Sequence, residues 1–201
     1  MGLSMQRSLV AVAAVILSST VSQAHPGGPA HDLVHGFLHP IGGLDHVLAM
    51  VGVGLLAAQL GGRALWLVPG AFVVVMAAAA AFGAAGAMLP RLETGVAASV
   101  FVLGAVVALR LGMPASLAAA IVGLFAIFHG VAHGAELPQT MSGLSYGTGF
   151  VAATAVLHVA GIGIGLLTRR LNDPIGAHAL RTIGACIAII GVMMVVTGAL
   201  I

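Results

Sequence analysis

The sequence predicts an all-α membrane protein, in which a polytopic bundle of six transmembrane helices follows a cleaved signal peptide. Of the 201 residues, 60% are hydrophobic and only 6% are charged, whereas soluble domains carry about 25% charged residues. Apolar runs of about 20 residues, the length that crosses the hydrocarbon core as a helix, recur after residue 40. These runs are apolar all round, which excludes the alternating pattern of a membrane β-barrel.

Residues 1–24 have the features of a secretory signal peptide. Arg7 supplies a positively charged start, a short apolar run follows, and Ser22 and Ala24 fit the small residues that precede a cleavage site. We expect cleavage after Ala24, so that the mature chain begins at His25 outside the cytoplasm. An uncleaved anchor is the alternative, and it leaves the following residues on the same side.

Residues 25–201 are predicted to form one transmembrane domain, which begins with a histidine-rich leader over residues 25–38. Glycine, proline and arginine mark the breaks between its apolar runs. The many glycines predict close helix contacts, because small residues let helix backbones approach one another in lipid. The expected spans are residues 42–61, 64–88, 94–111, 114–135, 144–168 and 180–201.

The arginines predict the orientation of the bundle. With the mature N-terminus outside, the outer loops hold only Arg91, whereas the cytoplasmic loops hold five arginines. This bias follows the positive-inside rule and predicts a multi-pass protein of the bacterial inner membrane with a periplasmic N-terminus. The five cytoplasmic arginines are Arg63, Arg110, Arg169, Arg170 and Arg181.

Two polar motifs occur at the ends of the first and fourth predicted spans, HPIGGLDHVLAM from His39 and FHGVAHGAELP from Phe128. In the second motif the ionisable residues fall on one helix face, at positions i, i+4 and i+7. The first span runs inward and the fourth outward, so both motifs are expected at the same depth on the outer side. The candidate metal ligands are His39, Asp45, His46, His129, His133 and Glu136.

These ligand types favour a site for a borderline divalent ion. Imidazole nitrogen and carboxylate oxygen suit Ni²⁺, Co²⁺ and Zn²⁺, and ionisable groups this close to hydrocarbon indicate function. The single cysteine, Cys186, excludes a thiolate cage within one chain. Two alternatives stay open: the histidines hydrogen-bond only to neighbouring helices, or Asp45 caps the first helix.

Further residues are candidates for capturing or relaying the ion. Positions 31, 35 and 39 repeat every four residues, so a helical leader aligns them, whereas a disordered leader does not. The thioether of one methionine, a turn after His46, is either a weak ligand or a packing group. The histidine in the middle of the fifth span is a relay ligand, a proton carrier or a partner of Thr154. The candidates are His25, His31, His35, Met50 and His158.

At both motifs the sequence resembles the HupE/UreJ family of membrane proteins. The family patterns, HPxxGxDHxxxM in the first helix and HGxAHGxE in the fourth, are both met here. The resemblance covers essentially the whole mature chain. It implies permeation of Ni²⁺, or of Co²⁺ in some members, without ATP hydrolysis. It also implies nickel supply to hydrogenases and ureases, whose maturation proteins are candidate partners.

Other functional classes fit the sequence less well. His129 and His133 have the spacing of the HExxH zinc-protease motif, but Gly130 occupies the position of the general base. No enzyme and no fixed cofactor are therefore expected, and a net charge of +2 is too small for a nucleic-acid surface. A proton-coupled carrier and a non-conducting metal sensor or accessory protein stay open. Because imidazole must be unprotonated to bind metal, uptake is expected to fall as the pH drops through about 6.5.

Overall fold

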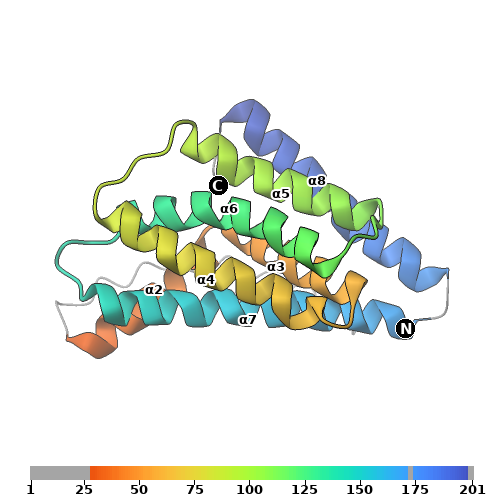
Figure 1. The fold of residues 1–201 in the computed structure, drawn as a ribbon, viewed down its shortest axis with the longest axis horizontal. Coiled ribbons are helices and arrows are strands. Elements are labelled where there is room, and N and C mark those ends of the chain that lie inside the picture. Colours follow the sequence, from red (N-terminus) through yellow and green to blue (C-terminus); the bar gives the residue numbers. More distant parts are fainter. Residues whose placement is uncertain (1–27, 172–173, 199–201) are drawn as a thin grey trace, which may run out of the picture.

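The computed structural model describes residues 28–171 and 174–198, and the predicted signal peptide and His25 lie outside this part of the chain. All regular secondary structure in the described ranges is helical, as predicted. Figure 1 shows the helices side by side in a bundle. They are α2 (Pro29–Gly42), α3 (Leu44–Leu60), α4 (Ala64–Ala84), α5 (Leu92–Ala108), α6 (Ala115–Ala135), α7 (Gly143–Arg170) and α8 (Ile175–Thr197).

Helices α3 to α8 occupy the six predicted spans. Four of them, α4, α6, α7 and α8, are each long and apolar enough to cross a membrane alone. Helix α5 is equally apolar but has 17 residues, the lower limit for a spanning helix. Helices α2 and α3 form a fifth candidate span together, with a bend of 82° between them. The chain is therefore a multi-pass membrane protein.

Two helix boundaries differ from the predicted ones for identifiable reasons. Helix α4 ends at Ala84 instead of residue 88, because Gly86 adopts a φ of 89°, a left-handed conformation that stops helices. Helix α8 starts at Ile175 instead of residue 180, directly after Pro174. The first two turns of α8 contain polar residues, which extend the helix beyond its apolar run.

The described part of the leader is helical from Pro29 onward, so the predicted alignment of His31, His35 and His39 is found. Helix α2 continues through Gly42, and the extended conformation of Gly43 (φ −97°, ψ 119°) separates it from α3. The carboxylate of Asp32 accepts a hydrogen bond of 2.8 Å from the backbone N–H of Ser142, which precedes α7. Gly36 of α2 lies directly against the backbone of α7. These contacts fix α2 on the first turns of α7.

Close backbone contacts pair the helices. Helices α3 and α7 meet at Gly54 and Gly161, where an added Cβ would overlap backbone carbonyl oxygens of the partner helix. Helices α5 and α8 meet in the same way and lie side by side along one edge of the bundle (Figure 1). Not every glycine of α7 is a contact point, because a Cβ at Gly163 would meet nothing within 4 Å.

The glycines of the second polar motif bring α6 against α4. Gly130 and Gly134 each follow a candidate histidine ligand, and a Cβ at either position would overlap the backbone of α4 at Met76 or Ala80. The motif therefore encodes two things at once, the imidazoles and the close packing of the helix that carries them.

We expect Gly134→Val to lower the free energy of unfolding by about 1–3 kcal/mol, the usual cost of overpacking. The added side chain meets the carbonyl oxygen of Ala80, which belongs to a rigid helix backbone. Thermal unfolding in detergent, followed by circular dichroism, measures this loss. Gly163→Val is the matched control, and it should change stability by less than about 0.5 kcal/mol. Equal losses in the two variants would contradict the proposed packing.

Candidate metal-binding site

Five of the six predicted ligands converge where α3 begins and α6 ends. They form two groups of three, and within each group one ligand atom from every residue lies within 4.8 Å of the others. We call the more exposed group, His39, His133 and Glu136, the outer triad. We call the more buried group, His46, His129 and His133, the inner triad. His133 belongs to both.

The outer triad joins helix α2 to the end of α6 through one carboxylate oxygen. Oε2 of Glu136 lies 3.1 Å from Nε2 of His39 and 3.0 Å from Nδ1 of His133. An ionised carboxylate only accepts hydrogen bonds, so both ring nitrogens donate to it. The side chains of His39, His133 and Glu136 are 36%, 14% and 54% exposed, so this triad is open to solvent on one side.

The inner triad lies deeper and joins α3 to α6. Nδ1 of His46 lies 2.9 Å from Nε2 of His133. Because Nδ1 of His133 donates to the carboxylate, Nε2 carries the lone pair of the neutral ring and accepts the proton of His46. His46 and His129 are fully buried. The two triads together therefore form a continuous series of ligands from partly exposed to fully buried.

Two buried hydroxyl groups support the inner triad, and neither was predicted from the sequence as part of it. Oγ of Ser99, in α5, lies 2.8 Å from Nε2 of His129. Oγ1 of Thr154, in α7, lies 3.4 Å from Nε2 of His46. Thr154 is therefore not the partner of His158, which was one of the alternatives for that histidine, because its hydroxyl contacts His46 instead. The available signal was a hydroxyl inside an apolar span, which has to find a partner in a neighbouring helix.

Aromatic rings surround the imidazoles. The ring of Phe150, in α7, contacts two of these histidines. Its centroid lies 4.8 Å from that of His133, which both triads share, and 5.1 Å from that of the buried His46. Tyr146, also in α7, is 5% exposed, and its ring lies 5.9 Å from that of His39. The Tyr146 hydroxyl is buried without a hydrogen-bond partner among the described residues. These rings restrict the positions that the histidines can adopt.

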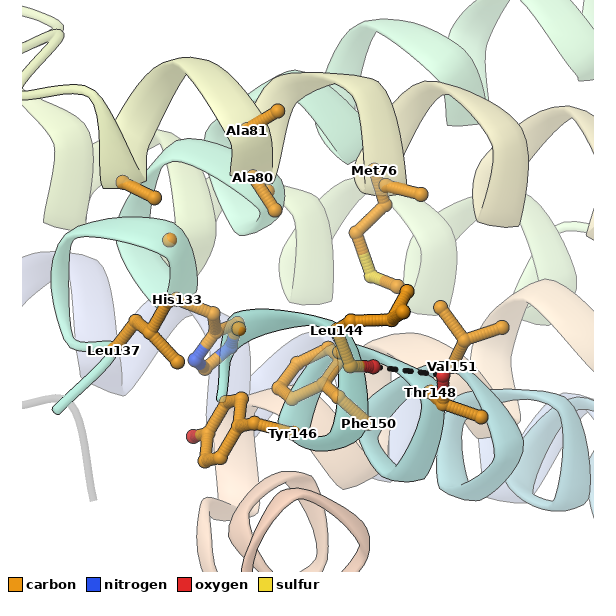
Figure 2. A pocket seen from close by; sticks show the side chains of 16 residues that line it. Met76, Ala80, Ala81, His133, Leu137, Leu144, Tyr146, Thr148, Phe150 and Val151 are labelled. Atoms are coloured by element: carbon orange, nitrogen blue, oxygen red, sulfur yellow. Dashed lines mark hydrogen bonds between the residues drawn. The ribbon is translucent and has the colours of Figure 1, made fainter. Parts of the chain in front are cut away.

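An apolar cavity of about 650 Å³ lies beside the outer triad, between α4, α6 and α7. Figure 2 shows His133, Leu137, Tyr146 and Phe150 grouped at one end of it. Most of its wall consists of alanine, glycine and aliphatic side chains. Such a wall cannot replace the hydration shell of a dication, so the coordinating groups lie at the edge of this cavity and not around it.

Asp45 is not part of either triad. It lies in the first turn of α3 and is 9% exposed, but its carboxylate forms no hydrogen bond or ion pair with the described residues. The alternative that Asp45 caps the helix is wrong, because Gly43 holds the cap position without a side-chain bond.

The capture and relay candidates in the described part of the chain are not members of either triad. The rings of His31 and His35 are adjacent in α2, with centroids 4.5 Å apart. Met50 is fully buried in the hydrophobic core. His158 is 2% exposed, and neither ring nitrogen has a partner in the described part of the chain. The ring of Phe72 contacts both His158 and His129, at 5.4 Å and 5.7 Å, and so connects this histidine to the inner triad.

Hydrogen bonding controls the ionisation of Glu136. The bonds from His133 and then from His39 hold the pKa of this carboxyl well below its usual value of 4.5, against the opposing effect of partial burial. The carboxylate therefore stays ionised at a pH where a free glutamate takes up its proton. Any stability that depends on this charge is present above pH 4.5 and is lost as the pH falls below it.

Comparisons with known proteins identify the family. A model of the HupE / UreJ protein family matches residues 12–194. Protein HupE of Rhizobium leguminosarum bv. viciae is 44% identical over 185 residues, which cover 92% of this chain and 95% of the relative. No solved structure gives a significant match. The chain belongs to the HupE/UreJ family of membrane permeases, which is a family of transporters and not of enzymes.

We expect His133→Phe to raise the pKa of Glu136 toward 4.5, and His39→Phe to raise it less, because His133 makes the larger contribution. The chain contains two glutamates, so a sample with ¹³C-labelled glutamate carboxyls gives two NMR signals. Glu136→Gln identifies the signal to follow during an acid titration. An unchanged titration in both phenylalanine variants would contradict the hydrogen-bonded geometry of the outer triad.

Proposed function

We propose that this HupE/UreJ protein carries Ni²⁺ across the bacterial inner membrane into the cytoplasm, for the maturation of nickel enzymes. The ion is bound first by the outer triad and then by the inner triad, with His39, His46, His129, His133 and Glu136 as ligands. The family membership supports a membrane permease, and the ligand chemistry supports a borderline divalent ion.

The observation that carries this proposal is the shared position of His133. Its Nδ1 faces the outer triad and its Nε2 faces the inner triad, at hydrogen-bond distances of 3.0 and 2.9 Å. A dication leaves water only where ligands replace its hydration shell. One ring that touches both triads allows the ion to exchange ligands stepwise without passing through a region that lacks donors.

The arginines support the direction of transport. In the described part of the chain, Arg91 lies at the end of the bundle that holds the triads, where α4 ends and α5 begins. The other arginines lie at the opposite end, which the positive-inside rule assigns to the cytoplasm. The triads then face the periplasm. Those other arginines are Arg63, Arg110, Arg169, Arg170 and Arg181.

Co²⁺ uptake by the same ligands is the second candidate, because imidazole and carboxylate bind both ions. A chain that senses the metal without conducting it is the third. The buried histidine His158, reached from the inner triad across Phe72, favours conduction over sensing, because a sensor needs no donor deep in the bundle.

We expect His133→Ala to reduce the uptake of radiolabelled nickel at limiting concentration by more than about tenfold, because both triads lose a ligand. His46→Ala and Glu136→Gln, which each remove a ligand from one triad, should reduce uptake as well. Asp45→Asn tests whether the remaining predicted ligand takes part. Uptake is measured in cells that contain equal amounts of inserted protein.

His178→Ala is the matched control for these variants. His178 is exposed near the start of α8, at the opposite end of the bundle, and its Nδ1 contacts the carbonyl oxygen of Pro174. Normal uptake in His178→Ala together with normal uptake in His133→Ala would refute the site. A loss in both variants would indicate a general effect of removing histidine.

We expect purified protein in sealed vesicles to fill the lumen with labelled nickel, at a rate that falls in the His133→Ala variant. The ligands permit ion exchange, and conduction requires binding loose enough for release. Unlabelled cobalt added in competition measures the preference between the two ions. Nickel that binds to the protein while the lumen stays empty would identify a sensor and overturn the permease.

A further inference from the structure

Ser99 is a buried serine of α5 that holds one of the inner-triad histidines. Its hydroxyl oxygen lies 2.6 Å from the backbone carbonyl oxygen of Val96 and 2.8 Å from Nε2 of His129. Both Ser99 and His129 are fully buried. The other ring nitrogen of His129, Nδ1, is also buried and has no hydrogen-bond partner in the described ranges.

The hydrogen-bond donors and acceptors around Ser99 fix the tautomer of the His129 ring. A serine hydroxyl has one proton to donate, and a carbonyl oxygen can only accept. The contact with Val96 is the shorter of the two, and without a proton between them the two oxygens would repel each other. The Ser99 proton therefore points to Val96. The 2.8 Å contact with His129 then requires that Nε2 carries a proton and donates it to the serine oxygen.

We propose that Ser99 is a positioning residue, which holds His129 as the Nε2–H tautomer and leaves the lone pair on Nδ1 to bind the transported ion. The tautomer stands on the hydrogen bonds alone, whereas the role in ion binding rests on the proposed function. Groups that hydrogen-bond the second nitrogen of a ligand histidine fix both its tautomer and its ring orientation. A neutral hydroxyl fixes the ring without placing a charged group inside the membrane span.

Ser99 is needed because no other group performs this role for His129. The second ring nitrogen of His129, Nδ1, has no hydrogen-bond partner among the described residues, so the other imidazoles of the inner triad do not select its tautomer. The ring of Phe72, 5.7 Å from that of His129, offers no lone pair for a hydrogen bond. Without the serine, the proton is free to move to Nδ1, and the ring then presents no lone pair on that atom.

The first test is the ¹⁵N NMR spectrum of histidine-labelled protein in lipid bilayers without nickel. The two tautomers have different ring-nitrogen shifts, and the signals of His129 are those that disappear in His129→Gln. We expect a protonated Nε2 and an unprotonated Nδ1 in the wild type, and a mixture of tautomers in Ser99→Ala. A proton on Nδ1 in the wild-type protein would overturn the proposal, and this measurement needs no variant of Ser99.

The second test is nickel binding by calorimetry. We expect Ser99→Ala to weaken nickel binding by about 10–100-fold, the usual effect of losing such a partner, and Ser99→Thr to restore it by returning the hydroxyl. Thr168→Val is the matched control, because Thr168 is buried and bonds the carbonyl of Gly165 three residues earlier, without a histidine partner. Wild-type affinity in Ser99→Ala would overturn the positioning role.

The two tests separate this inference from the proposed function. If the tautomer is as expected but neither the wild type nor Ser99→Thr binds nickel, transport is refuted and the hydrogen-bond assignment stands. If the wild type binds nickel and His133→Ala does not, while Ser99→Ala binds as the wild type does, the proposed metal site stands and the role of Ser99 is refuted.

Discussion

The imidazole of His133 is hydrogen-bonded at both nitrogens, and the arrangement of three helices depends on these bonds. Nδ1 connects α6 to His39 of α2 through Glu136, and Nε2 connects α6 to His46 of α3. In hydrocarbon an unpaired polar group costs more than in water, although each bond between membrane helices contributes only about 0.6–2 kcal/mol. The network therefore specifies which helices meet, while apolar and backbone packing supplies most of the stability.

That packing is encoded beside the ligands. Gly130 and Gly134 allow α6 to lie against the backbone of α4, and Gly36 allows α2 to lie against α7. The histidines that follow or precede these contacts are placed by helix backbones and not by flexible loops. A site built on close helix contacts is rigid, so its ligands keep their distances when no ion is bound.

The sequence was sufficient to predict the helices and much of the candidate site. Spacing along a helix placed His129, His133 and Glu136 on one face, and alternating topology brought them to His39 and His46. What it did not predict depends on contacts between helices. Helical periodicity does not say which neighbouring helix Ser99 or Phe150 faces. The proximity of Ser99 to His129 follows from the way α5 packs against α6. Nor did it predict that Asp45, one residue before His46, lies outside both triads.

The double role of His133 sets a limit on occupancy. A neutral imidazole has a single lone pair, so this ring cannot coordinate one ion through Nδ1 and a second ion through Nε2. In the proposed transport, a single ion occupies the outer triad and then the inner triad. A second ion gains all of its ligands only after the first ion has left His133. The stoichiometry at this end of the bundle is then one ion per chain. The transport rate saturates with ion concentration, because each ion has to wait until the His133 ring is free.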